Sequence, residues 1–158
     1  MIRVVLAVLL GSALLGASLP AAERAERDRN AALATDELDA LATEAELLAA
    51  RNDPVEVGRS PATTTVTLRP PNPTLTDGGR IHVADGRLVW MPRTGPNRTV
   101  RNEIPIRVAA PLRIEESTTL QLSLYRIDGE SVVRVRRAKV EKGGRGQPPH
   151  AGEPARFG

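Results

Sequence analysis

The sequence of 158 residues contains no cysteine, two histidines and only one residue each of Trp, Tyr and Phe. Without cysteine the chain can form no disulfide framework, no thiol nucleophile and no thiolate metal site. His82 and His150 are too few for a histidine-rich metal site. Three aromatic residues also provide little material for the stacking platforms that bind bases. We therefore expect no metal, no cofactor and no nucleic acid among the ligands of this protein.

The sequence motifs that carry common enzyme chemistry are also missing. There is no GxSxG nucleophile elbow, no HExxH zinc motif, and neither GxxxxGKS nor GxGxxG for phosphate binding. Glu115 and Glu116 are adjacent carboxylates, and neighbours on a strand point to opposite faces, so they cannot share a substrate. His82 is expected to be a solvent-facing strand residue. We therefore expect the protein not to be an enzyme, with no catalytic residues.

An uncharged run follows Arg3 and extends from Val4 to Ala22, interrupted only by glycines, serines and Pro20. As a helix, its nineteen residues would span about 28 Å, close to the ~30 Å hydrocarbon core of a bilayer. Residues 1–22 are therefore predicted to form a signal anchor or transmembrane helix, with residues 4–22 in lipid. Export machinery reads a basic residue ahead of an apolar run. We expect a single-pass protein of the cell membrane whose carboxyl-terminal domain is extracytoplasmic.

Removal of this run as a signal peptide is the competing interpretation. Signal peptidase requires small residues at positions −3 and −1 of its cleavage site. Cleavage after Ser18 places Gly16 at position −3, whereas cleavage after Ala22 places Pro20 there. Under this interpretation the mature protein would be a soluble exported binding module, and its basic end would bind anionic ligands.

Residues 23–53 are predicted to form an amphipathic helix that continues from the anchor. The stretch from Glu23 to Arg51 contains no Gly or Pro and is rich in Ala, Leu, Glu and Arg, which favour helix. Asp53-Pro54 ends it, because the residue before a proline is pushed out of the helical region. Apolar residues recur every three or four positions and so form one stripe: Ala31, Ala34, Leu38, Leu41, Ala45 and Leu48. Leu38, Leu41 and Leu48 are the candidate packing residues, against the protein's own sheet or another chain.

Residues 54–141 are predicted to form a small antiparallel β domain. Asp85-Gly86 and Asp128-Gly129 each interrupt an alternating apolar run, which is a strong signal for a two-residue hairpin turn. The implied registers place the apolar residues of each hairpin on one face: Ile81 opposite Trp90 and Val83 opposite Leu88, then Leu124 opposite Val133 and Leu122 opposite Val135. Further strands are expected at Thr63–Leu68, Ile104–Val108 and Leu112–Glu116. Because each hairpin has one apolar face, the preceding helix is the expected cover.

The end of the chain is basic and poor in bulky apolar residues. Residues 134–158 hold seven Lys or Arg and two Glu, whereas residues 22–51 hold eight acids and four Arg. Residues 142–158 are rich in Gly and Pro and are predicted to be a disordered basic tail. They cannot bury enough apolar surface to offset the entropy of ordering.

A candidate modification site lies in the Pro-flanked segment before residue 100. Asn97-Arg98-Thr99 matches the N-glycosylation sequon. If the domain lies outside the cell, we expect Asn97 to be available for glycosylation.

The order of these parts resembles that of type IV pilins and pseudopilins: an apolar amino-terminal helix, an internal Pro20, an amphipathic continuation and then an antiparallel sheet. The opening MIRVVLAVLLGSALLGASLPAAERAERDR and the two Asp-Gly hairpins also resemble a family of uncharacterised haloarchaeal proteins that occurs alongside pilus-like secretion components. The resemblance implies an α+β, pilin-like fold whose apolar helix lies in the membrane or filament core beneath a β headpiece. It also implies a membrane-anchored structural or accessory component of an archaeal pilus or secretion-type assembly, acting through contacts with other envelope proteins.

Overall fold

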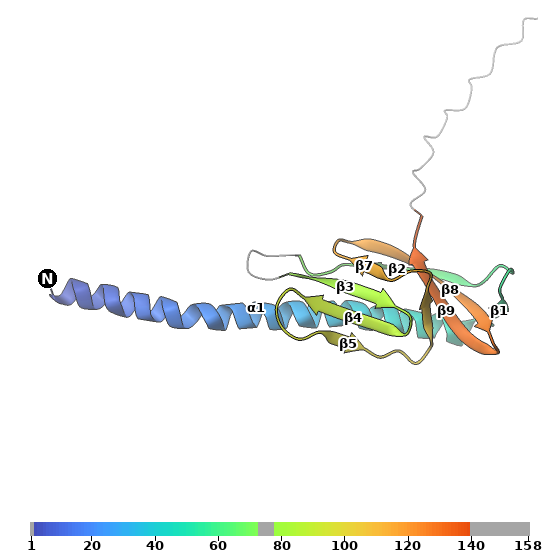
Figure 1. The fold of residues 1–158 in the computed structure, drawn as a ribbon, viewed down its shortest axis with the longest axis horizontal. Helices are drawn as coiled ribbons and strands as arrows, with labels where there is room; N and C mark the ends of the chain where they lie inside the picture. The colour runs from blue at the N-terminus through green and yellow to red at the C-terminus, as the bar shows by residue number, and fades with distance from the viewer. Residues whose placement is uncertain (1, 73–77, 140–158) are drawn as a thin grey trace, which may run out of the picture.

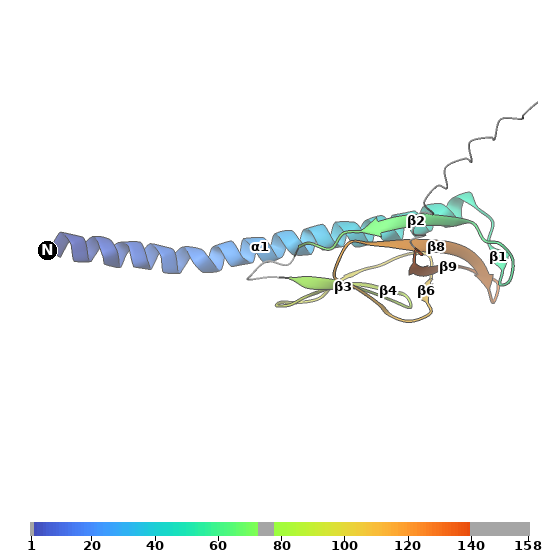
Figure 2. The same cartoon turned by 90° about the horizontal axis from the view of Figure 1, so that it is seen from above.

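The computed structural model describes residues 2–72 and 78–139, which form an α+β fold in which one long helix packs on two β-sheets (Figure 1). Helix α1 spans Ile2–Arg51. Its amino-terminal half extends away from the sheets, and its carboxyl-terminal half lies along them (Figure 2). The strands are β1 (Val55–Glu56), β2 (Thr63–Leu68), β3 (Gly79–Ala84), β4 (Arg87–Pro92), β5 (Arg98–Val100), β6 (Ile106–Val108), β7 (Leu112–Ile114), β8 (Thr118–Ile127) and β9 (Glu130–Arg137). The predicted tail, residues 142–158, lies outside the described residues.

Helix α1 is continuous through Pro20 and ends at Arg51, close to the end that Asp53-Pro54 predicted. The Asn52 side chain donates a hydrogen bond from Nδ2 to the carbonyl oxygen of Leu48, at 2.9 Å. This bond satisfies one of the carbonyls that a helix leaves free at its carboxyl end. The positive charge of Arg51 in the last turn is also favourable there, because the helix dipole is negative at that end.

The strands form two sheets. In the five-stranded sheet, β8 is central: β1 and β2 both pair with it, β9 pairs with it antiparallel, and β6 lies beyond β9. The four-stranded sheet has the order β5-β4-β3-β7 and is antiparallel throughout. The prediction of one small antiparallel sheet was therefore wrong, since there are two sheets, and β1–β8 and β6–β9 are parallel pairs. Parallel partners are joined by long connections, so no local turn signal marks them.

Both predicted hairpins are confirmed with their registers. Across β3 and β4, Ile81 pairs with Trp90, and across β8 and β9, Leu124 pairs with Val133. At the second turn, Asp128 and Gly129 have φ angles of 52° and 83°. Such positive angles belong to the two-residue turns whose twist matches that of the strands they join.

The other predicted strands are also present. Strand β2 has the predicted bounds, whereas β6 and β7 are shorter than the ranges 104–108 and 112–116. Strands β1 and β5 were not predicted. They have two and three residues, too few to show an alternating pattern.

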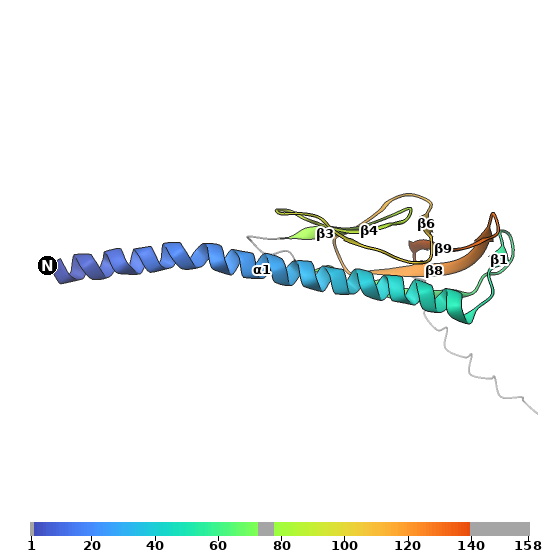
Figure 3. The ribbon, with the colours of Figure 1, turned by 90° about the horizontal axis from the view of Figure 1, so that it is seen from below.

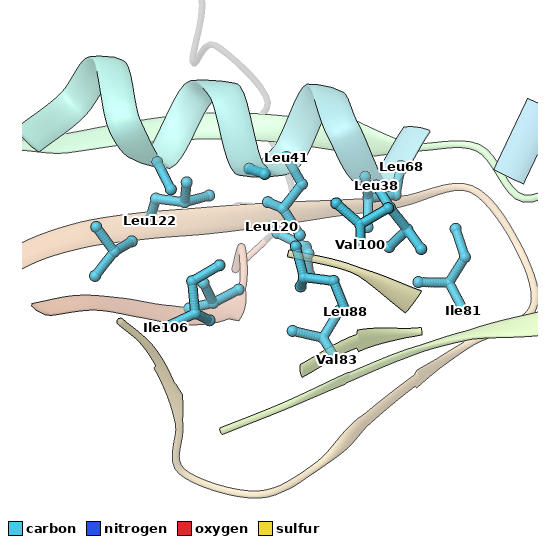
Figure 4. Packing of buried hydrophobic residues seen from close by; sticks show 14 of the residues in the cluster. Leu38, Leu41, Leu68, Ile81, Val83, Leu88, Val100, Ile106, Leu120 and Leu122 are labelled. Carbon is cyan, nitrogen blue, oxygen red and sulfur yellow. The ribbon is translucent and has the colours of Figure 1, made fainter. Parts of the chain in front are cut away.

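The core lies where the helix and both sheets meet (Figure 4). Most of the apolar stripe of α1 is buried in it, including Leu38, Leu41 and Leu48, so the protein's own sheets occupy this face of the helix. Trp90 is only 1% exposed, as its predicted place on the apolar face of the first hairpin requires. Gly79 lies against its ring: a Cβ added there would overlap Cη2 of Trp90. No larger residue fits at this position without displacing the indole.

Candidate functional site

The most unusual surface of this protein is the amino-terminal half of α1, which extends beyond the sheets in all three views (Figures 1, 2 and 3). We call residues 2–22 the projecting segment. Its large apolar side chains near the amino end are each 56–68% exposed: Val4, Val5, Leu6, Val8, Leu9 and Leu10. Successive helical residues are rotated by about 100°, so these side chains spread over about two thirds of the circumference, and the small apolar Ala7 lies in the remaining sector. A helix that is apolar all round is suited to apolar surroundings rather than to water.

The projecting segment is also apolar and exposed at its junction with the charged part of α1. Leu19, Ala21 and Ala22 are exposed, and the first charged residue after them is Glu23. At 1.5 Å per residue, the segment is roughly 30 Å long. Across residues 2–72 and 78–139, the structure contains no helix with the length and apolar character that a membrane crossing requires.

Residues 23–29 of α1 connect the projecting segment to the packed half, and we call them the neck. They are rich in both acids and arginines, and Asn30, just after them, is the first buried residue of the described helix. Arg27 donates from Nε to the carbonyl oxygen of Glu23, at 3.2 Å, which holds its stem along the helix.

A groove of about 120 Å³ separates the neck from the connection between β4 and β5. We call it the neck groove. Arg24 and Arg27 line it from α1, and Arg98 lines it from the first position of β5. Asp28 is its acidic lining residue, and the remaining lining is small or apolar: Ala31, Pro92, Thr94, Gly95 and Pro96. The groove therefore has an excess of positive charge. It lies beside the point where the projecting segment leaves the two sheets and the half of α1 that packs on them, which together we call the head.

Asn97, the candidate glycosylation residue, lies in the same β4–β5 connection and is exposed. Its neighbours Pro96 and Arg98 line the neck groove. The asparagine is thus accessible to a modifying enzyme, and its modification stays a prediction.

The other candidate residues do not form a catalytic or metal-binding arrangement in the described part of the chain. His82 is half-buried on β3, between Val89 of β4 and Arg113 of β7 in the strand register. Glu115 and Glu116 are exposed and follow β7. Within residues 2–72 and 78–139, no three His, Cys, Asp or Glu side chains are grouped so that they could hold a metal ion. His150 lies outside the described residues.

Asp85 has a role that its place in a hairpin turn did not reveal. Its carboxylate accepts hydrogen bonds from the main-chain N–H of Val108, at 2.8 Å, and from the guanidinium of Arg107, at 3.4 Å. The N–H of Gly86 donates to the carbonyl oxygen of Ile106, at 2.9 Å. The turn of the four-stranded sheet is thereby tied to β6 of the five-stranded sheet. The Val108 hydrogen bond, assisted by Arg107, lowers the pKa of Asp85 from its usual 3.8.

Two acidic side chains on opposite sides of the packed half of α1 also hold the sheets, which the sequence did not indicate. Glu37 accepts a hydrogen bond from the main-chain N–H of Arg69, at 2.9 Å. Glu46 accepts one from the N–H of Glu103, at 3.3 Å. These carboxylates bind backbone donors that no strand partner uses, so they attach the helix at the margins of its apolar stripe.

A family profile matches residues 1–138 of the sequence. The chain belongs to the DUF7311 family. That family is described as a domain of unknown function. The DUF7311 match includes the projecting segment, the neck and the described strands through β9. No curated protein sequence and no solved structure matches the chain.

Proposed function

We propose that this protein is a membrane-anchored, pilin-like structural or accessory component of a pilus or secretion-type assembly in an archaeal cell envelope. The observation that carries the proposal is the division of one continuous helix into an apolar half that extends beyond the sheets and a half buried against them. The projecting segment would lie in lipid, with the amino end inside. The head would face the outside and contact other envelope proteins.

The energetic argument concerns the described apolar side chains of residues 4–10. Full burial of a Val or Leu side chain is worth about 1.5–3 kcal/mol, so the six together offer on the order of 10 kcal/mol when they enter apolar surroundings. The head has no surface that covers them, because the segment extends beyond it (Figure 1). Lipid, or the apolar helices of neighbouring subunits, would supply this burial.

The shape of the molecule supports the pilin-like part of the proposal. A single helix acts as both stalk and core element, and the β head packs on its carboxyl-terminal half alone. This is the arrangement that the resemblance to type IV pilins and pseudopilins implies. In such an arrangement the head is the part that contacts partners, and the apolar half holds the head at the membrane surface.

The first experiment is the intact mass of the full chain purified from the membranes of an archaeal host. We expect a species that retains residues 4–22. A mass that lacks the run up to Ser18 or Ala22 would refute the anchor and favour the soluble exported binding module.

A second experiment tests whether the apolar character holds the protein in the membrane. A charge at the centre of a membrane helix is unfavourable by about 3 kcal/mol, so Leu10→Arg should move protein from the membrane to the soluble fraction. Leu47→Arg, on an exposed position of the packed half, is the matched control and should leave the distribution unchanged. If the two variants are divided between the membrane and soluble fractions in the same proportion, the proposal is contradicted. Cross-linking and mass spectrometry in the same host would then identify the partners of the head.

A further inference from the structure

The neck groove brings together arginines from two elements that are distant in the chain. Arg24 and Arg27 belong to α1, and Arg98 belongs to β5, and the lining contains a single acid, Asp28. In the described part of the chain, none of these three guanidinium groups forms an ion pair with a carboxylate within 4 Å. Each guanidinium presents several N–H donors in a planar fork that matches the oxygens of a phosphate. Apart from Nε of Arg27, which donates to the carbonyl oxygen of Glu23, these groups offer unused donors of the kind that bind phosphate.

Two further hollows lie at the end of the sheets from which the projecting segment leaves, and arginines line both of them. A second hollow there is lined by Arg80 and Arg93 with Glu115, and a third by Arg29 with Glu26. Glu23, an exposed acid of the neck, lies close by. Even with these acids counted, arginines are in excess in the three hollows at the end of the sheets from which the projecting segment leaves.

The position of the groove along the helix matches the headgroup layer of a bilayer. Arg24 and Arg27 follow Ala22 by two and five residues, so they lie about 3 and 7.5 Å beyond the end of the apolar run. The headgroup region on each side of the hydrocarbon core is about 5–8 Å thick. If residues 4–22 occupy the hydrocarbon, the groove lies at the depth of the lipid phosphates.

We propose that the neck groove binds the phosphate of an anionic membrane lipid and so holds the base of the head against the bilayer surface. This inference rests on the proposed function, because it requires the projecting segment to be in lipid. Arg24, Arg27 and Arg98 are the phosphate-binding residues. Thr94, Gly95 and Pro96 form the opposite wall, which faces the headgroup.

The absence of cysteine makes a direct test possible. A single Thr94→Cys substitution places one thiol in the wall of the groove, and the full chain is then inserted into nanodiscs. The rate at which a water-soluble maleimide modifies this thiol is compared between phosphatidylcholine discs and discs that also contain phosphatidylglycerol. We expect slower modification in the anionic discs, and weaker protection at high salt. Each basic residue near an anionic surface contributes about a fivefold factor, so Arg27→Gln and Arg98→Gln should each reduce the protection about fivefold.

Three controls make the outcomes decisive. Arg136→Gln removes an exposed arginine whose side chain binds Gln121 on the five-stranded sheet, and it should leave the protection unchanged. The fluorescence of Trp90 in each variant reports that the head is folded. Inorganic phosphate is added to phosphatidylcholine discs, and full protection by it would overturn the assignment to lipid.

The experiment separates failure of the inference from failure of the proposed function. If the chain does not enter discs of either composition, the membrane anchor is refuted. If it enters both and the thiol reacts equally fast in both, the anchor stands and the lipid-binding groove is refuted.

Discussion

Replacement of Leu41 by Ala tests whether the packed half of α1 is an integral part of the head. The side chain is completely buried and points from the helix toward Leu120 of β8 (Figure 4). Its truncation removes apolar contacts and leaves a cavity between the helix and both sheets, which relax only partly. Substitutions of this type cost 2–5 kcal/mol, and complete enclosure places this one at about 3–4 kcal/mol. Leu41→Asp should be more damaging, because the carboxylate would be buried without a partner.

The assay is urea unfolding followed by the fluorescence of Trp90, the only tryptophan of the chain and a core residue. With an unfolding slope of about 1–3 kcal/mol per molar urea, a loss of 3 kcal/mol should lower the midpoint by about 1–3 M. Leu33→Ala is the matched control on the same helix, at a position that is 44% exposed. Its midpoint should move only slightly. Equal midpoints for the two variants would refute the conclusion that the Leu41 face of the helix is the cover of the sheets.

Three further predictions concern the head. Gly79→Ala should destabilise it by about 1–3 kcal/mol in the same urea assay, because the new Cβ would overlap the ring of Trp90; an unchanged midpoint would show that the indole can move aside. The pKa of Asp85 is lower in the folded state than the usual 3.8. The ionised carboxylate therefore stabilises the folded protein above pH 3.8, and this stabilisation is lost as the pH falls through the folded-state pKa. Asp85→Asn should remove this part of the acid sensitivity of the urea midpoint, and an unaltered pH profile would contradict it. Peptide mass spectrometry should detect a glycan on Asn97 in a glycosylating archaeal host, and Thr99→Ala should abolish it; a fully unmodified peptide from the outer surface would contradict that prediction.

The parts of the fold that the sequence predicts are those that local signals determine. Two residues decide each hairpin, because Asp128-Gly129 and Asp85-Gly86 fix both the turn and the register of the strands beside it. The parallel pairs β1–β8 and β6–β9 depend on which distant strand edge is free after the rest has folded. Local patterning contains no information on this choice. The division into two sheets was therefore not predicted.

The candidate site shows the same difference between local and distant information. The apolar run can be recognised from the sequence alone, because it consists of consecutive residues. The neck groove exists because the fold places Arg98 beside Arg27, and no spacing in the sequence reveals that proximity. The sequence places Asp85 in a hairpin turn, and the turn is a sufficient reason for an Asp-Gly pair. Nothing in the sequence therefore indicates that Asp85 also connects the two sheets through its hydrogen bond to Val108.

The continuity of α1 connects the stability of the head with its placement at a membrane. Because the packed half is held both by its apolar stripe and by Glu37 and Glu46, the head cannot turn about the helix axis without breaking core contacts. Any orientation imposed on the neck is therefore transmitted to the whole head. Pro20 lies just before the neck and has no N–H to donate within the helix, so it is a place where the helix bends at lower cost. An anchor in lipid alone would leave the head free to tilt about that point, and a second contact beside it, at the neck groove, would fix the tilt on one side of the helix.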